Sequence, residues 1–246
     1  MTYVINNNMD QLPKESLLRI ISYLAISEKL NLAATCKRLK HLVMNSDLYK
    51  NLVLRGDRSF YDFKEYFENY KEYQRQVRNL QLRFMFIEPS VVLALPKQFV
   101  NLREIGWISE DSFEEVAVNE QAAQHWKNIT RFKEHSPSFI SAGILEQDGF
   151  CNLIELDVEI CDNCDSLICQ LSKAPKLKIL RLKHFEITLL ALDQLQCNAQ
   201  QLEVLNLRNF RVSRRTQSRA FSISSLQIRA SRSLGNRHSY SRTRLG

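Results

Sequence analysis

The cysteines are the residues of this chain whose spacing comes closest to a chemical motif. Two residues separate Cys161 from Cys164, and Cys151 and Cys169 lie nearby in the sequence. A structural zinc site needs four ligands, which commonly come as two close pairs. Here only one pair is close, Cys161 stands at an inward position of a repeated strand pattern, and Cys169 lies on the apolar face of a predicted helix. We therefore predict that these cysteines pack as small hydrophobic side chains and bind no metal.

The other residue types that commonly perform catalysis form no recognisable pattern. The five histidines are scattered and match neither a nucleophile–base arrangement nor a metal-ligand spacing. Six glycines in the whole chain form no glycine-rich phosphate loop. We therefore expect a chain that is not an enzyme, that uses no cofactor, and whose function is binding.

The composition is that of a protein with a folded core. Its 246 residues are 44% hydrophobic, which is enough for one elongated or two compact domains. No apolar run approaches the roughly 18 residues of a membrane-spanning helix. The first residues, MTYVINNNMD, have neither the basic start nor the apolar centre of a secretory signal. We expect a cytoplasmic or nuclear protein without a membrane partner, in which the cysteines are reduced.

The formal net charge of +7 is concentrated at the C-terminal end. Residues 213–246 contain eight arginines and no lysine or acidic residue, which leaves 26 basic and 27 acidic residues elsewhere. The charge therefore belongs to a Ser/Arg-rich tail, which we predict to be disordered over residues 232–246. We do not expect a nucleic-acid partner for the folded part. RNA binding by the tail is a third hypothesis, and it would depend strongly on salt.

The segment at 12–24, LPKESLLRIISYL, predicts a helix with an unusually wide apolar surface. Pro13 suits the first helical position, where its missing N–H has no helical partner, and Glu15 suits the positive end of the helix dipole. Such a helix is either buried on most sides within a small bundle or covered by a partner chain. The apolar positions that make it so wide are Leu17, Leu18, Ile20, Ile21 and Leu24.

Two further helical segments follow it. Residues 28–43 form a second amphipathic pattern that Ser27 can cap, and residues 46–52 contain a short apolar helical turn. So few short helices bury too little surface to be stable alone, and no disulfide framework is available to them. These segments therefore favour a partner chain.

This N-terminal part resembles the F-box family over about residues 10–52. The positions that carry the resemblance are Leu12, Pro13, Glu15, Leu17, Leu18, Ile21, Tyr23, Leu24, Leu30, Ala33, Ala34, Cys36, Lys37, Arg38, Leu42, Asp47, Leu48 and Tyr49. Three features depart from the family pattern. The loop that often reads Asp-Pro-x-Asp is AISEK here, Leu39 replaces an aromatic residue, and Tyr49 replaces a tryptophan.

The resemblance implies both a partner and a domain boundary. F-box helices bind the Skp-type adaptor of an SCF ubiquitin ligase, and through it the cullin–RING core. The second face of the opening helix would then belong to the adaptor, and the F-box would span residues 10–54 with Cys36 buried inside it. The adaptor-binding residues that the resemblance implies are Leu12, Pro13, Leu17, Leu18, Ile21, Leu24, Leu30, Ala33, Cys36 and Lys37.

The second part of the chain repeats one pattern, apolar-x-x-apolar-x-apolar-x-x-(Cys or Phe). Three copies align without gaps, at 153–161, 177–185 and 202–210. Weaker copies cover 77–85, 102–110, 129–137 and 223–231. In the copy at 129–137, Lys133 and Glu134 interrupt the pattern. Because alternate residues of a strand point to one side, each copy predicts a strand whose apolar face is buried only by stacking on its neighbours.

These copies resemble leucine-rich repeats of the cysteine-containing type. The segments between them favour short helices, at 90–99, 113–126, 165–174 and 189–198. The resemblance implies an α+β protein, in which the helical F-box precedes a short α/β solenoid with a parallel sheet and helices on its convex side. About six or seven repeats would cover 77–231, joined rigidly to the F-box by a helical connector at 55–76. An unrelated α/β domain with similar strands is the alternative.

Polar residues alternate with the inward leucines and would line the concave face of the sheet. In register, Asp157 would face Arg181 and Glu159 would face Lys183, so internal ion pairs are one interpretation. The other hypothesis is a substrate site for an acidic or phosphorylated protein segment, because arginine matches the geometry of carboxylate and phosphate. Its residues would be Arg181, Lys183, Arg208 and Arg229.

Two functions follow from these expectations and both stay open. In the first, the chain is the substrate-recognition subunit of an SCF E3 ubiquitin ligase: the F-box binds the adaptor and the repeats bind an unidentified substrate for degradation. In the second, it is a non-catalytic leucine-rich-repeat scaffold that acts outside a ligase. Co-purification with cullin as well as with the adaptor would separate the two.

Overall fold

The computed structural model describes residues 12–24, 26–44, 46–56, 74–83, 86–109, 117–136, 140–159, 164–198, 201–213 and 221–229. Side chains are described throughout these ranges except at 26–27, 30, 46–47 and 221–229. The connector predicted at 55–76 lies mostly outside these residues, and the tail predicted at 232–246 lies wholly outside them. Within the described ranges, every helix is too short or too polar to cross a membrane.

The N-terminal part is a small group of helices. It comprises α1 (Lys14–Tyr23), α2 (Ile26–Thr35), α3 (Lys37–Val43) and the 3-10 helix η2 (Ser46–Tyr49). Pro13 was predicted at the first helical position, but it lies one residue earlier, as the N-cap of α1, because its ψ of 147° is extended and not helical. Cys36 begins α3, because its Sγ accepts a hydrogen bond from the backbone N–H of Leu39 at 3.4 Å. The prediction that Cys36 is buried is wrong: a capping side chain remains at the surface, and this one is exposed.

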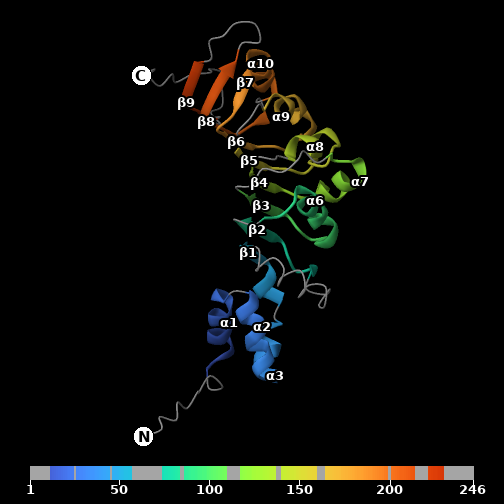
Figure 1. Cartoon of the computed structure of the whole chain (residues 1–246), viewed down its shortest axis with the longest axis vertical. Helices are drawn as coiled ribbons and strands as arrows, with labels where there is room; N and C mark the ends of the chain where they lie inside the picture. The colour runs from blue at the N-terminus through green and yellow to red at the C-terminus, as the bar shows by residue number, and fades with distance from the viewer. Residues whose placement is uncertain are drawn as a thin grey trace, which may run out of the picture.

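The remainder is built on one sheet, whose strands follow one another in chain order along most of its length (Figure 1). Adjacent strands are parallel from β1 to β8, and the last strand pairs antiparallel with β8. The strands are β1 (Asn51–Arg55), β2 (Asn79–Arg83), β3 (Glu104–Ile108), β4 (Arg131–His135), β5 (Glu155–Glu159), β6 (Ile179–Lys183), β7 (Glu186–Thr188), β8 (Val204–Ser213) and β9 (Phe221–Arg229). Both β6 and β7 lie along the same parallel edge of β8, one after the other.

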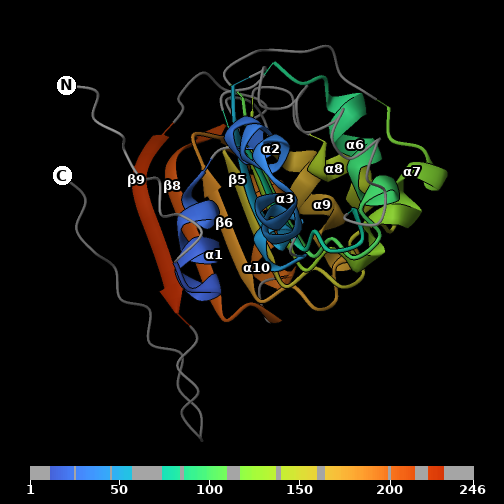
Figure 2. The same ribbon diagram turned by 90° about the horizontal axis from the view of Figure 1, so that it is seen from below.

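Helical segments connect successive strands and cover one side of the sheet, as Figures 1 and 2 show. They are α6 (Pro89–Gln98), α7 (Glu120–Gln124), η3 (His125–Asn128), α8 (Ser141–Glu146), α9 (Asp165–Gln170), η4 (Leu171–Lys173) and α10 (Leu189–Asn198). The sheet's other side is the concave face. A parallel sheet with helices on its convex side is the arrangement that the sequence predicted.

The strands are stacked with the same register at every step. Partner positions lie 24 to 28 residues apart along the chain. At each step one carbonyl before a strand accepts two backbone N–H groups of the next unit, at 2.7–3.1 Å. The accepting carbonyls belong to Lys50, Arg78, Arg103, Thr130, Ile154 and Lys178. This repeated contact fixes the register by the backbone as well as by the apolar pattern.

The core lies between the sheet and its helices. Both inward positions of nearly every parallel strand hold a buried apolar side chain, such as Leu180 and Leu182 on β6. The same core continues into the N-terminal helices, because Leu48 of η2 packs against the core of the sheet and against that of the helices. The two parts of the chain are therefore joined by packing as well as by the chain itself.

The sheet departs from the sequence-based prediction at both ends. Residues 46–52 were predicted as one helical turn, yet the helical turn ends at Tyr49 and residues 51–55 form β1, because Leu52 and Leu54 point into the core and Val53 points out. At the other end, the copy at 223–231 forms β9, which runs antiparallel to β8 and does not continue the parallel series. Short elements α8 and β7 were also not predicted.

Candidate interaction surfaces

Helix α1 has two apolar faces, of which only one is buried by this chain. Leu17 and Ile21 are each 1% exposed and pack against α3, together with Leu39, Leu42 and Val43. In contrast, Ile20 is 43% and Tyr23 is 78% exposed. At about 100° per residue these two side chains lie on one side of the helix. Leu12, which precedes the helix, is also exposed. The exposed apolar side chains of Ile20 and Tyr23 therefore form a surface that a partner protein could cover.

This division corrects the predicted adaptor-binding set. Leu17 and Ile21 lie in the helices' own core, so a partner cannot contact them without unfolding the domain. Of the other predicted residues, Leu12, Pro13, Cys36 and Lys37 are exposed, Leu18, Leu24 and Ala33 are half-buried, and the side chain of Leu30 lies outside the described ones. Sequence reasoning missed Ile20 and Tyr23 as surface residues, although their spacing of three places them on one side of the helix, away from Leu17 and Ile21.

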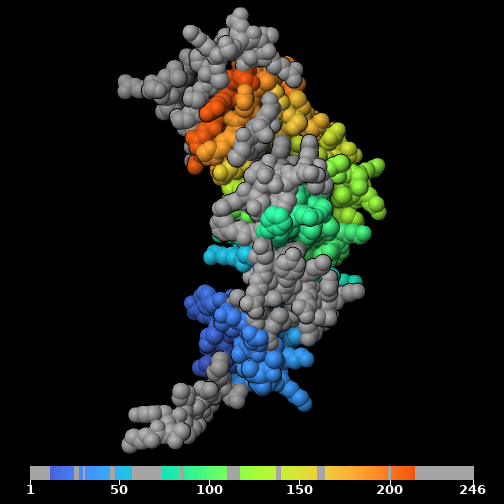
Figure 3. All heavy atoms as spheres, viewed as in Figure 1, coloured from blue at the N-terminus to red at the C-terminus, as the bar shows by residue number. Residues whose placement is uncertain are grey.

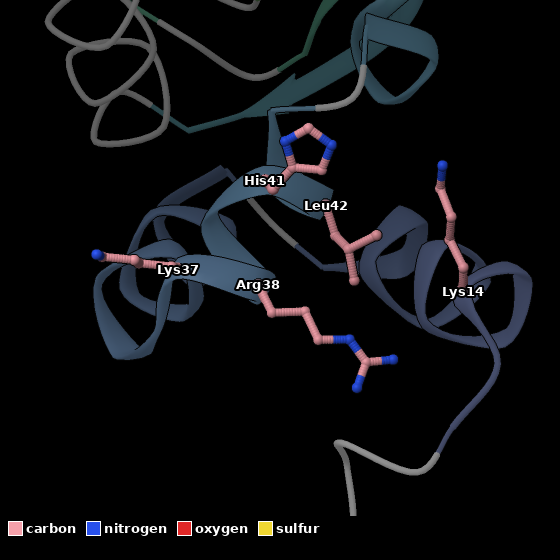
Figure 4. Close-up of a pocket in the computed structure, with 5 residues that line it drawn as sticks. All are labelled: Lys14, Lys37, Arg38, His41 and Leu42. Carbon is pink, nitrogen blue, oxygen red and sulfur yellow. The ribbon is translucent and has the colours of Figure 1, made fainter.

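A shallow basic pocket lies between the start of α1 and α3 (Figure 4). Lys14 lines it from α1, and Lys37, Arg38, His41 and Leu42 line it from α3. The Arg38 guanidinium donates a hydrogen bond to the carbonyl of Leu12 at 3.0 Å, which fixes the segment leading into α1. The pocket therefore places positive charge between the start of α1 and α3.

A buried lysine fixes α2 against the end of this domain. Lys29 is buried, and its Nζ lies 6.0 Å from the centre of the Tyr49 ring, within reach of a cation–π contact. Its burial lowers the pKa of the Lys29 ammonium. The cation–π contact offsets part of the cost of that burial and joins α2 to η2, one residue before the sheet begins.

The concave face carries three rows of side chains, one for each outward position of the strands. From β1 to β8 the first row reads Asn51, Asn79, Glu104, Arg131, Glu155, Ile179 and Val204. The second row reads Val53, Gln81, Gly106, Lys133, Asp157, Arg181 and Asn206. The third row reads Arg55, Arg83, Ile108, His135, Glu159, Lys183 and Arg208.

The acidic side chains of strand β5 contact basic side chains on both neighbouring strands, β4 and β6. On the β4 side, Arg131 lies 3.7 Å from Glu155, and the two ring nitrogens of His135 lie 3.3 Å from Asp157 and 3.2 Å from Glu159. On the β6 side, Arg181 pairs with Glu155, and the Nζ of Lys183 lies 3.4 Å from Asp157. These pairs satisfy the carboxylates at the centre of the concave face.

Asp157 is the most strongly held of these carboxylates. Burial alone would raise its pKa, but the hydrogen bond from His135 and the charges of Lys183, His135 and Lys133 outweigh burial and lower the pKa. Asp157 therefore stays ionised and keeps the cations of β4 and β6 in place.

The predicted substrate residues divide into paired and unpaired groups. The expected register holds, because Arg181 lies opposite Asp157 and Lys183 lies opposite Glu159. The ion pairs are shifted by one outward position, however: Arg181 pairs with Glu155, and Lys183 pairs with Asp157. Arg208 is exposed and donates from Nε to Asn206 at 3.2 Å. The expectation that Arg229 continues this row is wrong, because antiparallel pairing sets it opposite Val204 and sets Ser225 opposite Arg208. The interpretation as internal ion pairs fits Arg181 and Lys183.

Both tryptophans belong to the core and not to a recognition loop. Trp107 and Trp126 are fully buried. Trp126 donates from Nε1 to the carbonyl of Leu93 at 3.1 Å and packs edge-on against Phe132 and Phe150, with ring centres 5.0 and 5.7 Å away. These contacts stabilise the middle of the sheet.

The interrupted copy at 129–137 still forms strand β4, and Glu134 takes an inward position. Glu134 is completely buried, in register between Trp107 and Val158. Its two carboxylate oxygens accept hydrogen bonds from the backbone N–H groups of Ile140 at 2.6 Å and Ser141 at 3.2 Å. Burial raises the pKa of Glu134 to about 7, although these hydrogen bonds oppose the shift. The carboxylate thus holds the start of α8 against the sheet.

The described cysteines and acidic residues provide no metal site. Among these residues, no three histidine, cysteine or acidic side chains are grouped to hold a metal ion. Cys164 is buried, and this burial raises the pKa of its thiol. Cys169 is exposed, which contradicts its predicted burial, and its Sγ lies 2.9 Å from the side-chain oxygen of Gln194. Cys161 lies outside the described residues.

Comparison with protein families identifies the N-terminal part. The F-box-like family matches residues 9–55. None of the curated proteins matches the chain. The chain therefore contains an F-box-like domain, as the sequence predicted, and this domain ends with β1. F-box domains bind Skp-type adaptors, which fits an adaptor-binding subunit of a ubiquitin ligase.

Proposed function

We propose that this chain is a non-catalytic, substrate-recognition subunit of an SCF E3 ubiquitin ligase. Its F-box-like domain binds the Skp-type adaptor and, through it, the cullin–RING core. Its curved sheet binds a protein substrate, which the ligase marks for degradation. The chain acts in the cytoplasm or the nucleus and uses neither a cofactor nor a metal.

The observation that carries this proposal is the exposed face of α1 within the matched F-box-like segment. Ile20 and Tyr23 lie on a helix whose opposite side is already buried by the domain itself. An exposed apolar stripe on a short helix costs solubility unless a partner covers it. The family match supplies that partner, since F-box domains bind Skp-type adaptors.

The assignment of the sheet to leucine-rich repeats is part of the proposal. It is supported by the unit length of 24 to 28 residues, the alternation of strand and helix, and the bifurcated carbonyl contact repeated at every step. Stacked units of this kind form extended concave surfaces that bind other proteins. The polar, charged face of this sheet is the surface available for a substrate.

The junction between the two parts supports a positioning role. Leu48 packs against both cores, and the Lys50 carbonyl accepts N–H groups from Arg78 and Asn79 at 3.0 and 2.9 Å. Because β1 follows η2 after a single residue, the sheet cannot rotate freely against the helices. A substrate on the concave face would therefore be held at a fixed place relative to the adaptor.

The adaptor interface is tested by the double variant Ile20→Asp/Tyr23→Asp. Both positions are exposed, so the domain should fold while pull-down of the purified Skp-type adaptor is lost. Val100→Asp, at an exposed apolar residue of the sheet part, is the matched control and should leave adaptor capture unchanged. Undiminished adaptor capture by the double variant would rule out this face as the interface.

A scaffold that acts outside a ligase is the alternative function. Both functions predict adaptor binding, so the discriminating measurement is the presence of cullin in the purified complex. Cullin that co-purifies with the wild type and is lost with Ile20→Asp/Tyr23→Asp supports the ligase. Adaptor recovered repeatedly without cullin supports the scaffold.

A further inference from the structure

The third row of the concave face has a charge pattern that its own contacts do not explain. Its first two members, Arg55 and Arg83, are in-register neighbours, and so are its last two, Lys183 and Arg208. Like charges side by side in a sheet destabilise it. The row thus carries a pair of cations at each end, one at the F-box end and one at the C-terminal end.

Carboxylates of the described residues compensate these cations only in part. Arg55 is exposed and has no ion-pair partner among the described residues, and Arg83 donates to the Gln81 side chain at 2.6 Å. The Nε of Arg83 is buried without a hydrogen-bond partner among them. At the other end Lys183 pairs with Asp157, but within the described residues the Arg208 side chain makes a polar contact only with the Asn206 side chain and has no ion-pair partner.

The middle of the row is different. His135 and Glu159 contact each other at 3.2 Å, and Ile108 is apolar. The acidic groups of β5 are already engaged by β4 and β6. The carboxylates at the centre are therefore already engaged, and the arginines without an ion-pair partner among the described residues lie at two separate places on one line across the strands.

We infer that this row binds an extended acidic segment of a partner protein, with one anionic group at each end. The inference rests on the proposed role of the sheet as the substrate-binding surface and specifies the class of substrate. Arg55 and Arg83 form the first anchor, and Arg208 forms the second, beside Lys183, which adds positive charge there although it is already paired with Asp157 at 3.4 Å. Guanidinium groups bind carboxylate or phosphate in a bidentate manner, so aspartate, glutamate and phosphorylated residues share the required chemistry.

The spacing of the anchors sets the length of the segment. Parallel strands lie about 4.8 Å apart, so the four steps from Arg83 to Lys183 span about 19 Å and the six steps from Arg55 to Arg208 about 29 Å. An extended chain advances about 3.3 Å per residue. The anionic groups of the ligand should therefore be separated by about six to nine residues.

The test measures binding of labelled synthetic peptides to the full chain by fluorescence polarisation. Each peptide carries two glutamate pairs, separated by a Gly/Ser spacer of none, about three, about eight or about twenty residues. A second series carries phosphoserine in place of glutamate, which distinguishes the two sources of negative charge. We expect the tightest binding with the spacer of about eight residues, at least about tenfold tighter than without a spacer.

Charge reversal then identifies the anchors. Arg83→Glu and Arg208→Glu should each weaken binding of the best peptide about tenfold and remove the preference for spacer length. Lys97→Glu makes the same change of charge on the convex helix α6 and should have little effect. Capture of the adaptor serves as the folding control, so loss of peptide binding with intact adaptor capture separates this inference from the proposed function.

Three outcomes would overturn the inference. The first is affinity that follows total peptide charge with no optimum of spacing, and the second is equal weakening by Lys97→Glu. The third is no binding of either peptide series at physiological salt. Poly(U) is included as a competitor: displacement of the best peptide by poly(U), with the same loss on Arg83→Glu and Arg208→Glu, would instead assign the row to RNA.

Discussion

The F-box-like domain and the sheet bury their apolar residues in different ways. The helices of the domain enclose one small core around Leu17 and Ile21 and leave Ile20 and Tyr23 in solvent. The strands share one continuous core from Tyr49 to Val212, and the outward faces of most strands are polar. A partner of the domain would therefore cover exposed apolar side chains, whereas a partner of the sheet would contact mainly charged and polar side chains. The two surfaces should respond differently to mutation and to salt.

The largest expected change in the free energy of unfolding comes from removing a buried side chain at the middle of the sheet. Trp126→Ala removes an aromatic cluster and a buried hydrogen bond, and should lower the free energy of unfolding by about 3–5 kcal/mol. Urea unfolding followed by circular dichroism measures this loss. Leu190→Ala is the control, because the Leu190 side chain is 65% exposed and its truncation should change stability little.

The next prediction separates the two faces of α1. Leu17→Ala should destabilise the F-box-like domain by about 2–5 kcal/mol, because Leu17 is buried in its small core. Hydrogen exchange should then increase in α1 and α3 while β5 and β6 stay protected. Ile20→Ala should leave exchange unchanged and weaken adaptor capture. Equal exchange in both variants would show that the two faces are not distinct.

Glu134 gives the sheet a pH dependence of opposite sign to that expected from Asp157, whose pKa is lowered. The pKa of Glu134 is raised to about 7, so the protonated form is favoured by folding, and this stability is present at low pH. It should be lost as the pH rises from the unfolded value of about 4.5 to about 7, by up to about 3 kcal/mol, and then stay level. Glu134→Gln should remove this dependence, although it also gives up one of the two hydrogen bonds, because the amide nitrogen of glutamine cannot accept from a backbone N–H. Parallel unfolding curves of both proteins across the range would contradict it.

The smallest expected effect concerns the ion pairs of the concave face. Arg131 lies near Glu104 at 2.7 Å and near Glu155 at 3.7 Å, but its side chain is largely exposed. Arg131→Ala should lower the free energy of unfolding by at most about 1 kcal/mol, and less in high salt. Thermal melts at low and high salt measure this difference. A loss as large as that of Trp126→Ala would show that charge and not the apolar core holds the strands in register.

Much of the sheet could be predicted because its signal is local and repeated. Nearly every parallel strand carries two inward apolar residues two positions apart, with Glu134 of β4 as an exception, and the same spacing recurs in unit after unit. The F-box-like segment was recognisable because its apolar positions occur in a specific order. The errors occur where one sequence pattern fits two structures. Residues 51–55 fit a helical turn as well as a strand, and only pairing with β2 decides for the strand.

The sequence by itself determined which residues form helices and strands in most of the chain, since helical and strand periods differ. It also determined that β4 continues the series despite Glu134, because the period requires a strand there. Tertiary structure alone decided which face of α1 is buried, since Ile20 and Tyr23 give the exposed side apolar groups as well. It also decided that Arg181 pairs with Glu155 and that Arg229 lies opposite Val204. Ion pairing and strand direction depend on neighbours in space, and the sequence does not specify those neighbours residue by residue.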